Sequence, residues 1–278
     1  MKGKTLQRAS AKRPAARAGK ASRAALVRAL AERVDTAARN ATGIAQLSAM
    51  HELSLAEAYA VQRASIARRI ARGEKRIGMK MGFTSRAKMV QMGLSDLIWG
   101  RLTDAMIIEE GGSLSLKDYV HPRVEPEIAF LLKKPLAGRV TALEAQAAVE
   151  AIAVAMEVID SRYENFKFSL ADVVADNTSA AGVVIGPWHA PHVDYSNLGL
   201  VLSFDGAARQ VGSTAGILGH PLRSLVAAAR MAGEAGEVIQ AGEIVMAGGI
   251  TAAEALTPGS WVETEMQHLG RVGLRTLA

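Results

Sequence analysis

Two glutamates stand where a buried strand is expected. Residues 124–130 read VEPEIAF, an apolar run interrupted by Glu125 and Glu127. Side chains alternate between the two faces of a strand, so these two carboxylates point the same way. Two like charges on one face of an apolar strand cost free energy unless something positive lies between them. The stretch therefore raises the question of which positive group they face.

A third carboxylate, Glu157, is the only charge within the apolar run 151–159, AIAVAMEVI. An acid on one strand together with a Glu-x-Glu pair on another can offer three oxygen ligands, which suits a hard ion such as Mg²⁺ or Mn²⁺. The alternative is a solvated strand, because Glu-x-Glu is common on exposed faces. Pro126 between the pair indicates an edge strand or a bulge. The residues alone leave both interpretations open.

The composition excludes several other kinds of site. The chain of 278 residues has no cysteine, which rules out disulfides, thiolate zinc sites and a cysteine nucleophile. Its six histidines lack paired metal-binding spacing, and there is neither a P-loop nor a nucleophile elbow. No apolar run approaches the roughly 18–20 residues of a membrane span. We expect a cytoplasmic globular protein with no membrane partner.

The net charge of +6 belongs to the N-terminal segment. Residues 1–24 hold eight basic residues and no acid, which leaves the rest of the chain at −2. The segment is rich in alanine, arginine and serine, which predicts a disordered basic tail. A transit-type leader and a nucleic-acid arm are alternatives. No aromatic residues interleave the charges, so we expect no nucleic-acid partner.

Helical periodicity comes first along the chain and short strands follow. It predicts helices over 22–39 and 55–72, the second opened by a capping box from Ser54 to Glu57. A strand over 75–83 and a short helix from Ser85 to Gly93 come next. Strands are then expected near 101–108, 124–132, 152–160, 181–187, 198–205, 207–212, 243–248, 260–266 and 271–276, with helices near 141–151 and 221–232.

This order of elements indicates an α+β protein with a mostly antiparallel β body. Asp205-Gly206 between two alternating runs predicts a hairpin. We divide the chain into a tail (1–24), an N-terminal helical part with the first strand (25–95) and a β-rich catalytic body (96–278). The last two parts are expected to form one catalytic unit.

Long motifs in one order resemble a known family. They are GMKMGFTSRAKMVQMG (78–93), HPRVEPEIAFLLKKPL (121–136), EVIDSRYENFKFSLADVVADNTS (157–179), GILGHP (216–221) and MAGGITAAEAL (246–256). Together they resemble the hydratase/decarboxylase family of the fumarylacetoacetate hydrolase-like superfamily. The resemblance implies a mixed, mostly antiparallel β-roll or sandwich flanked by helices. It also implies Mg²⁺ or Mn²⁺ held by Glu125, Glu127 and Glu157, although Pro126 departs from the small residue usual between the first two.

Within that family the motifs are more similar to the decarboxylases than to the hydratases. The residues that favour this are YENFKF (163–168), Ile98 where hydratases commonly carry aspartate, and residues 246–256. The resemblance implies metal-dependent decarboxylation of 2-oxo-3-hexenedioate to 2-hydroxypenta-2,4-dienoate and CO₂ in aromatic meta-cleavage catabolism. Hydration of 2-hydroxypenta-2,4-dienoate and a non-catalytic partner subunit are the alternatives. Homo-oligomers and a complex with the pathway hydratase are also implied.

The same resemblance implies roles for further residues. Lys80 matches the family's candidate acid–base lysine, and its alternative is a lysine on the solvated face of a strand. Ser161 and Arg162 are implied substrate-binding residues, but Arg162 could instead pair with Asp160 or Asp176. The remaining implied substrate-binding residues are Thr84, Ser85, Gly249 and Thr251. Helix capping and a glycine turn are the alternatives for Thr84, Ser85 and Gly249.

Overall fold

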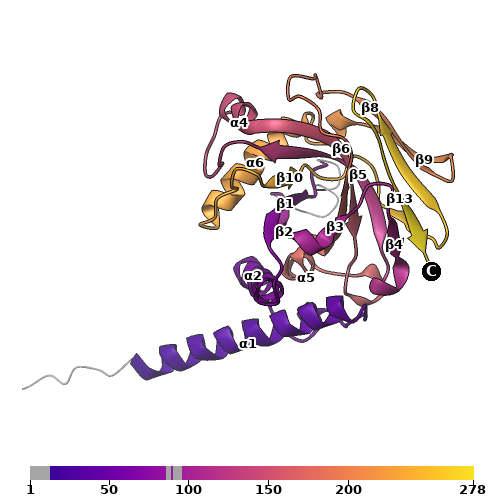
Figure 1. The fold of residues 1–278 in the computed structure, drawn as a ribbon. Coiled ribbons are helices and arrows are strands. Elements are labelled where there is room, and N and C mark those ends of the chain that lie inside the picture. Colours follow the sequence, from indigo (N-terminus) through magenta and orange to yellow (C-terminus); the bar gives the residue numbers. More distant parts are fainter. Residues whose placement is uncertain (1–12, 86–88, 90–95) are drawn as a thin grey trace, which may run out of the picture.

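The protein is a helical N-terminal part attached to two packed β-sheets. A computed structural model describes residues 13–85, 89 and 96–278 (Figure 1). Helix α1 (Arg13–Arg39) projects from the body, and α2 (Leu55–Ala71) lies between α1 and the sheets. Apolar residues of the two helices, including Leu30, Val34 and Val61, are buried against each other. This burial fixes α1 to the body through its C-terminal half.

The capping box that opens α2 is confirmed. The Ser54 side chain accepts a hydrogen bond from the Glu57 N–H, and the Glu57 carboxylate accepts one from the Ser54 N–H. The disordered tail expected for 1–24 differs from the structure over residues 13–24, which are the first turns of α1. Alanine, arginine and lysine are strong helix formers, and Pro14 lies in the first turn, where proline is tolerated. Residues 1–12 lie outside the described part.

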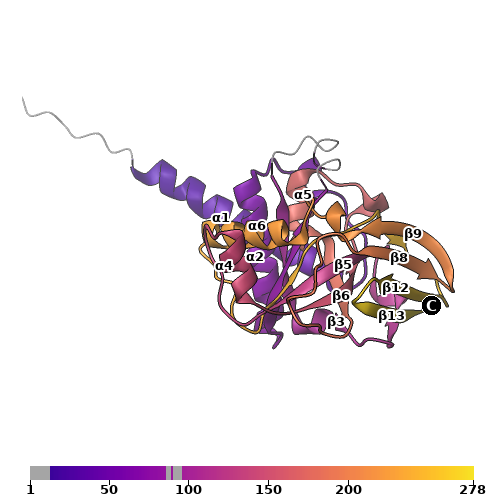
Figure 2. The ribbon, with the colours of Figure 1, turned by 90° about the horizontal axis from the view of Figure 1, so that it is seen from above.

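Two sheets form the body, as Figure 2 shows from above. The larger sheet has the order β2 (Ile98–Thr103), β1 (Arg76–Gly82), β10 (Ile244–Met246), β5 (Arg123–Leu132), β6 (Val149–Ile159), β7 (Ala180–Ile185) and β3 (Ile107–Ile108), and β11 (Glu254–Ala255) also pairs with β5. The smaller sheet has the order β4 (Ser113–Ser115), β13 (Gly270–Leu277), β12 (Trp261–Met266), β8 (Gly199–Phe204) and β9 (Ala207–Ser213).

The main core lies between these sheets. Phe130, Ile152 and Val154 of the larger sheet and Leu202 and Val262 of the smaller one belong to one buried cluster. Most strand pairs are antiparallel; the pairs β1–β10, β3–β7 and β4–β13 are parallel. Helices α4 (Ala142–Ala148), α5 (Leu170–Ala175) and α6 (Pro221–Glu234) flank the sheets. The predicted α+β class, with a mostly antiparallel body, is confirmed.

Most expected elements are present with shifted ends. The run 101–108 is divided between β2 and β3, and the helix expected over 141–151 ends at Ala148, where β6 begins. The Asp205-Gly206 hairpin is confirmed, with both residues at positive φ. Three short elements, β4, α5 and β11, were not expected. The helix predicted from Ser85 lies mostly outside the described residues.

The expectation that Pro126 marks an edge strand or a bulge is wrong. Strand β5 is an interior strand that pairs with β6 on one side and with β10 and β11 on the other. The Pro126 carbonyl accepts a hydrogen bond from the Ile250 N–H, so the proline faces the gap between β10 and β11. No ladder hydrogen bond needs the missing N–H there, and an interior proline is therefore tolerated.

Candidate metal centre and cavity

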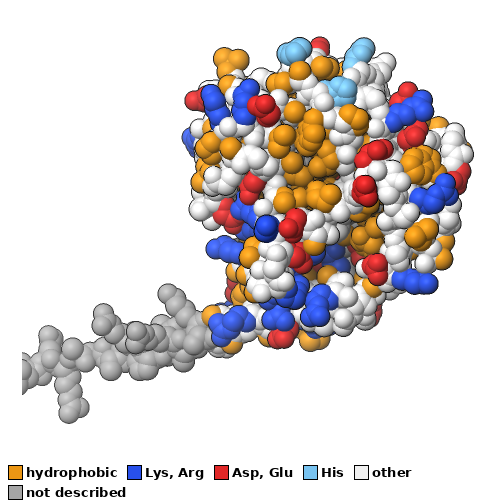
Figure 3. All heavy atoms as spheres, in the orientation of Figure 1, with side chains coloured by type: hydrophobic (Ala, Val, Ile, Leu, Met, Phe, Trp, Pro, Cys, Tyr) orange, Lys and Arg blue, Asp and Glu red, His pale blue; other side chains and the backbone are white. Residues whose placement is uncertain are grey.

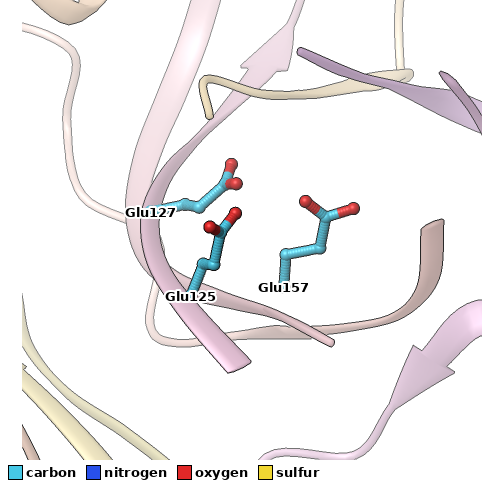
Figure 4. A group of neighbouring side chains, drawn as sticks. All are labelled: Glu125, Glu127 and Glu157. Carbon is cyan, nitrogen blue, oxygen red and sulfur yellow. The ribbon is translucent and has the colours of Figure 1, made fainter. Parts of the chain in front are cut away.

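The three glutamates expected to be ligands lie together. In the antiparallel pair of β5 and β6, Glu125 stands directly opposite Glu157, and Glu127 lies two residues farther along the same face. One carboxylate oxygen from each residue lies within 4.8 Å of the others. Figure 4 shows the three side chains pointing into the same space. Strand alternation and strand register together make this cluster.

These carboxylates occupy an environment that disfavours their charge. Glu127 and Glu157 are fully buried, and burial raises the pKa of Glu157 to about 7. Burial and the nearby Glu157 also raise the pKa of Glu127 well above its ordinary value. Glu127 Oε1 and Glu157 Oε1 accept no hydrogen bond from any residue that the structure describes. Buried oxygens that lack donors fit a divalent cation, whose preferred ligands are carboxylates.

A buried lysine lies beside the cluster. The Lys80 Nζ atom is 2.8 Å from Glu157 Oε2 and donates a hydrogen bond to the Thr178 carbonyl at 3.1 Å. Burial lowers the pKa of Lys80, but the three glutamates outweigh that effect, so the pKa lies above its ordinary value. The neighbouring carboxylates thus stabilise the Lys80 ammonium. A divalent cation among the three glutamates would favour the charged form of all three carboxyl groups.

The loop after β10 approaches the site so closely that it requires glycine. Gly248 has φ of +105°, and its N–H donates a hydrogen bond to Glu127 Oε2 at 2.7 Å. A Cβ at Gly248 would lie 2.2 Å from Thr84 Oγ1, and one at Gly249 would lie 2.6 Å from Glu125 Oε2. These glycines permit a close backbone approach, the use that glycine has in binding loops.

A cavity of about 100 Å³ opens beside Lys80 and Glu125. Its lining includes the polar residues Thr84, Ser85 and Ser179, together with Gly249. Its apolar lining residues are Phe83, Ile98, Ile159, Phe166, Phe168 and Val173. A small cavity lined by both polar and apolar side chains suits a short, unsaturated acid.

Among the predicted substrate-binding residues, Thr84, Ser85 and Gly249 line this cavity, whereas Ser161, Arg162 and Thr251 are not among its lining residues. The Ser161 hydroxyl accepts a hydrogen bond from the Tyr163 N–H. The Thr251 hydroxyl donates one to the Ala252 carbonyl. Their role in binding substrate stays a prediction.

The structure favours the ion-pair alternative for Arg162. Its side chain is buried and pairs with the Asp176 carboxylate, and it also donates hydrogen bonds to the Asp176 and Ala180 carbonyls. Asp160 accepts hydrogen bonds from the N–H groups of Val120 and His121. The partner of Arg162 is therefore Asp176.

Sequence reasoning missed Thr178 and Ser179. Residues 177–179 have φ of 51°, 55° and 59°, a left-handed run that costs of the order of 1–2 kcal/mol per residue. The Thr178 hydroxyl donates to the Trp99 carbonyl, and the Asn177 side chain donates to the Arg101 carbonyl, which holds this turn against β2. Ser179 Oγ lines the cavity and is buried with no hydrogen-bond partner in the described chain. The available signal was the run of polar residues DNTS between apolar segments.

None of the helices among the described residues is both long and apolar enough to cross a bilayer. A family model, fumarylacetoacetate (FAA) hydrolase C-terminal, matches residues 78–275. The chain belongs to the fumarylacetoacetate hydrolase family.

Particular members of that family are more similar to this chain than others. It is 56% identical over 247 residues to a 4-oxalocrotonate decarboxylase of a Pseudomonas species, covering 89% of this chain and 96% of the relative. It is 35% identical over 189 residues to a 2-hydroxypent-2,4-dienoate hydratase of Pseudomonas putida, covering 66% of this chain and 85% of that one. The expected greater similarity to the decarboxylases is confirmed.

A solved structure supports the same grouping. The 4-oxalocrotonate decarboxylase of Pseudomonas putida G7, complexed with magnesium and adipate, superimposes with a TM-score of 0.88 and 40% identity. The match covers 91% of this chain and 97% of that one. The expected fumarylacetoacetate hydrolase-like fold is confirmed.

Proposed function

We propose that this protein is a metal-dependent carboxy-lyase that converts 4-oxalocrotonate (2-oxo-3-hexenedioate) to 2-hydroxypenta-2,4-dienoate and CO₂. The observation that carries the proposal is the cluster of Glu125, Glu127 and Glu157 with Lys80 at the end of a small cavity. It occurs in a chain 56% identical to a decarboxylase of that name. Mg²⁺ or Mn²⁺ is the proposed cofactor, because the donors are all carboxylates.

The reaction breaks the bond between C5 and the C6 carboxyl carbon. Its electron pair forms a double bond between C4 and C5, and the original C3–C4 double bond shifts to C2–C3. The 2-oxo oxygen takes up the resulting charge and then a proton, which gives the 2-hydroxydiene. The substrate is its own electron sink, so no covalent nucleophile or organic cofactor is required.

A divalent ion bound by the three glutamates would act as a Lewis acid toward the 2-oxo acid end of the substrate. Lys80 is placed to donate a proton or a hydrogen bond to the 2-oxo oxygen, since its ammonium lies at the carboxylate cluster and lines the cavity. The hydroxyls of Thr84, Ser85 and Ser179 are placed to bind the C1 carboxylate. Ser179 has a free hydroxyl for this purpose among the described contacts.

The apolar lining residues have a separate task. Ile159, Phe166, Phe168 and Val173 are among the residues that line the cavity. Apolar side chains in the lining keep water away from the reacting carbons. Water exclusion disfavours hydration of the diene product, which is the reaction of the sister enzymes.

The proposal also covers the location of the protein in the cell and its partners. We propose a cytoplasmic homo-oligomer that associates with the pathway hydratase, on the basis of the family resemblance. Hydrophobic side chains gather over the middle of the face shown in Figure 3. An apolar area on the surface supports a subunit contact.

The test is a steady-state assay with two substrates, each with Mg²⁺ and with EDTA. We expect metal-dependent CO₂ release from 2-oxo-3-hexenedioate and no loss of diene absorbance from 2-hydroxypenta-2,4-dienoate. Diene loss without CO₂ release would assign the protein to the hydratases. Absence of activity on both substrates would favour a non-catalytic partner subunit.

A further inference from the structure

Arg123 extends the row of charged residues on the site face of β5. Residues 123, 125 and 127 lie at two-residue spacing, so the Arg123 side chain points to the same face as Glu125 and Glu127. The residue opposite Arg123 on β6 is Ile159, which lines the cavity. Arg123 therefore stands one step beyond the carboxylate cluster, at the rim of the cavity.

The guanidinium is held at that rim by an aromatic ring. The Arg123 Cζ atom lies 4.6 Å from the centroid of Phe166, and Phe166 also lines the cavity. Stacking uses the flat face of a guanidinium and leaves its N–H edge available for a carboxylate. Phe166 is itself constrained, with φ of 55° and ring contacts to His121 and Phe168. The ring thus fixes the position of a cation beside the cavity.

Arg123 makes no ion pair with any residue that the structure describes, whereas Arg76, Arg101 and Arg162, also buried or half-buried, each pair with a carboxylate. The residues outside the described part, 1–12, 86–88 and 90–95, contain no aspartate or glutamate. A half-buried guanidinium without a carboxylate from its own chain is suited to an anionic ligand.

The spacing matches a six-carbon dicarboxylate. Two residues along a strand advance by about 6.6 Å, which separates the backbone positions of Glu125 and Arg123. Five carbon–carbon bonds of about 1.5 Å in an extended diacid separate its two carboxyl carbons by roughly 6 Å. A substrate with its 2-oxo acid end at the glutamate cluster would thus present its second carboxylate near Arg123.

We propose that Arg123 binds the second carboxylate of the substrate and selects dicarboxylic over monocarboxylic 2-oxo acids. The inference rests on the proposed function, because it places the 2-oxo acid end at the glutamate cluster. Arg123 contacts a group that is present in the ground state. That carboxylate loses its charge as CO₂ forms, so removal of Arg123 raises KM for the dicarboxylate and does not lower kcat.

The test measures binding of two unreactive ligands, 2-oxoadipate and 2-oxohexanoate, to the Mg²⁺-loaded protein by calorimetry. They share the 2-oxo acid end and the number of carbons, and only the first has a second carboxylate. We expect wild-type protein to bind 2-oxoadipate about tenfold to a hundredfold more tightly. Arg123→Met should remove this preference by weakening 2-oxoadipate alone, and Arg123→Lys should keep part of it.

The matched control is Arg209→Met. Arg209 also stacks on an aromatic ring, with its Cζ atom 5.6 Å from the centroid of Phe204, but it lies on β9 of the smaller sheet. The control should keep the full preference. An unchanged preference in Arg123→Met, or an equal loss of both ligands in Arg123→Met and Arg123→Lys, would overturn the proposal. Absence of any preference in wild-type protein would do the same.

The two proposals fail in different ways. Calorimetry needs no turnover, so a preference that depends on Arg123 in a protein that releases no CO₂ would refute the decarboxylase and retain the carboxylate site. CO₂ release with no dependence of the preference on Arg123 would retain the decarboxylase and refute the role of Arg123. Failure of wild-type protein to bind either ligand would overturn both.

Discussion

The Asp176–Arg162 pair and the cluster of Glu125, Glu127 and Glu157 both contain buried acids. They differ in how many of their carboxylate oxygens accept a hydrogen bond. Asp176 is fully buried, and burial raises its pKa to about 6, but its two oxygens accept hydrogen bonds from the N–H and the side chain of Arg162. Glu127 and Glu157 are equally buried, and each has an oxygen with no donor among the described residues. Within the described part of the chain, the Asp176 oxygens all have donors, and those of Glu127 and Glu157 do not all have one.

This difference indicates a structural role for the Asp176–Arg162 pair and a functional role for the glutamate cluster. In a buried one-to-one pair of acid and base with all bonds made, each group supplies the counter-charge of the other, and loss of either partner is destabilising. In the glutamate cluster, burial raises the pKa of two carboxyl groups, and a bound cation would relieve the cost of keeping them charged. The unsatisfied cluster is thus the better candidate for chemistry, although both consist of the same kinds of residue.

The largest expected effect is that of Glu157→Gln on activity. The change removes a ligand charge with little change of shape and loses Lewis-acid stabilisation of several kcal/mol, so kcat should fall on the order of a thousandfold. The stability of the metal-free protein should fall less than in Asp176→Asn, because Lys80 keeps Glu127 and Glu125 as neighbouring carboxylates while their repulsion with Glu157 is removed. Metal-dependent CO₂ release and urea denaturation measure the two effects. Full activity in this variant would remove Glu157 from the site.

Asp176→Asn should show the opposite pattern. It leaves the buried Arg162 without a counter-charge, so the free energy of unfolding should fall by about 3–5 kcal/mol. Metal affinity of the folded protein should stay within a few-fold of wild type, because Asp176 is not in the glutamate cluster. Urea denaturation and metal titration test the comparison directly. Loss of metal binding without loss of stability would erase the distinction between the two clusters.

Lys80→Ala should lower turnover more than metal affinity. A general acid contributes typically about 10²–10⁴-fold, so we expect kcat to fall on the order of a hundredfold or more. Metal affinity should hold or increase, because the ammonium at 2.8 Å from Glu157 Oε2 competes with a cation for that carboxylate. Steady-state kinetics at saturating Mg²⁺ and metal titration separate these outcomes. A purely structural lysine would give unfolding and no such division.

Ser179→Ala should have the smallest effect on activity. It tests whether a single unbonded hydroxyl at the site has a functional role. Ser179 Oγ makes no hydrogen bond within the described chain, so its loss should leave stability unchanged, while kcat/KM should fall about tenfold if it binds substrate. The matched control is Ser224→Ala, whose buried hydroxyl donates to the Ala247 carbonyl. That control should lose stability, and the absence of any kinetic effect in Ser179→Ala would exclude it from substrate binding.

Local patterns predicted the longer elements well. The capping box before α2, the hairpin at Asp205-Gly206 and the apolar runs of β5 and β6 each depend on residues close in sequence. The turn 177–179 could not be predicted this way. Its left-handed residues are held by hydrogen bonds from Thr178 and Asn177 to carbonyls of β2, more than 70 residues away along the chain.

The roles of Arg162 and Pro126 could be decided only from contacts between segments distant in sequence. A single arginine near Asp160 and Asp176 can bind substrate or pair with either acid, and only the packing of α5 and the turn after it selects Asp176. A proline in an apolar strand suggests an edge, and only the gap between β10 and β11 explains its place in an interior strand. Both outcomes depend on segments distant in sequence.

The sequence by itself determined that Glu125 and Glu127 share a face, because alternation along a strand is a local property of the backbone. With the family resemblance, it also indicated Glu157 and Lys80 as their companions. Only the tertiary structure decided that Glu157 stands opposite Glu125 and that Lys80 reaches Glu157. It also decided that Ser179 lines the cavity and that Arg123 stacks on Phe166, another lining residue. Register and packing join strands separated by tens of residues, and no local pattern encodes those distances.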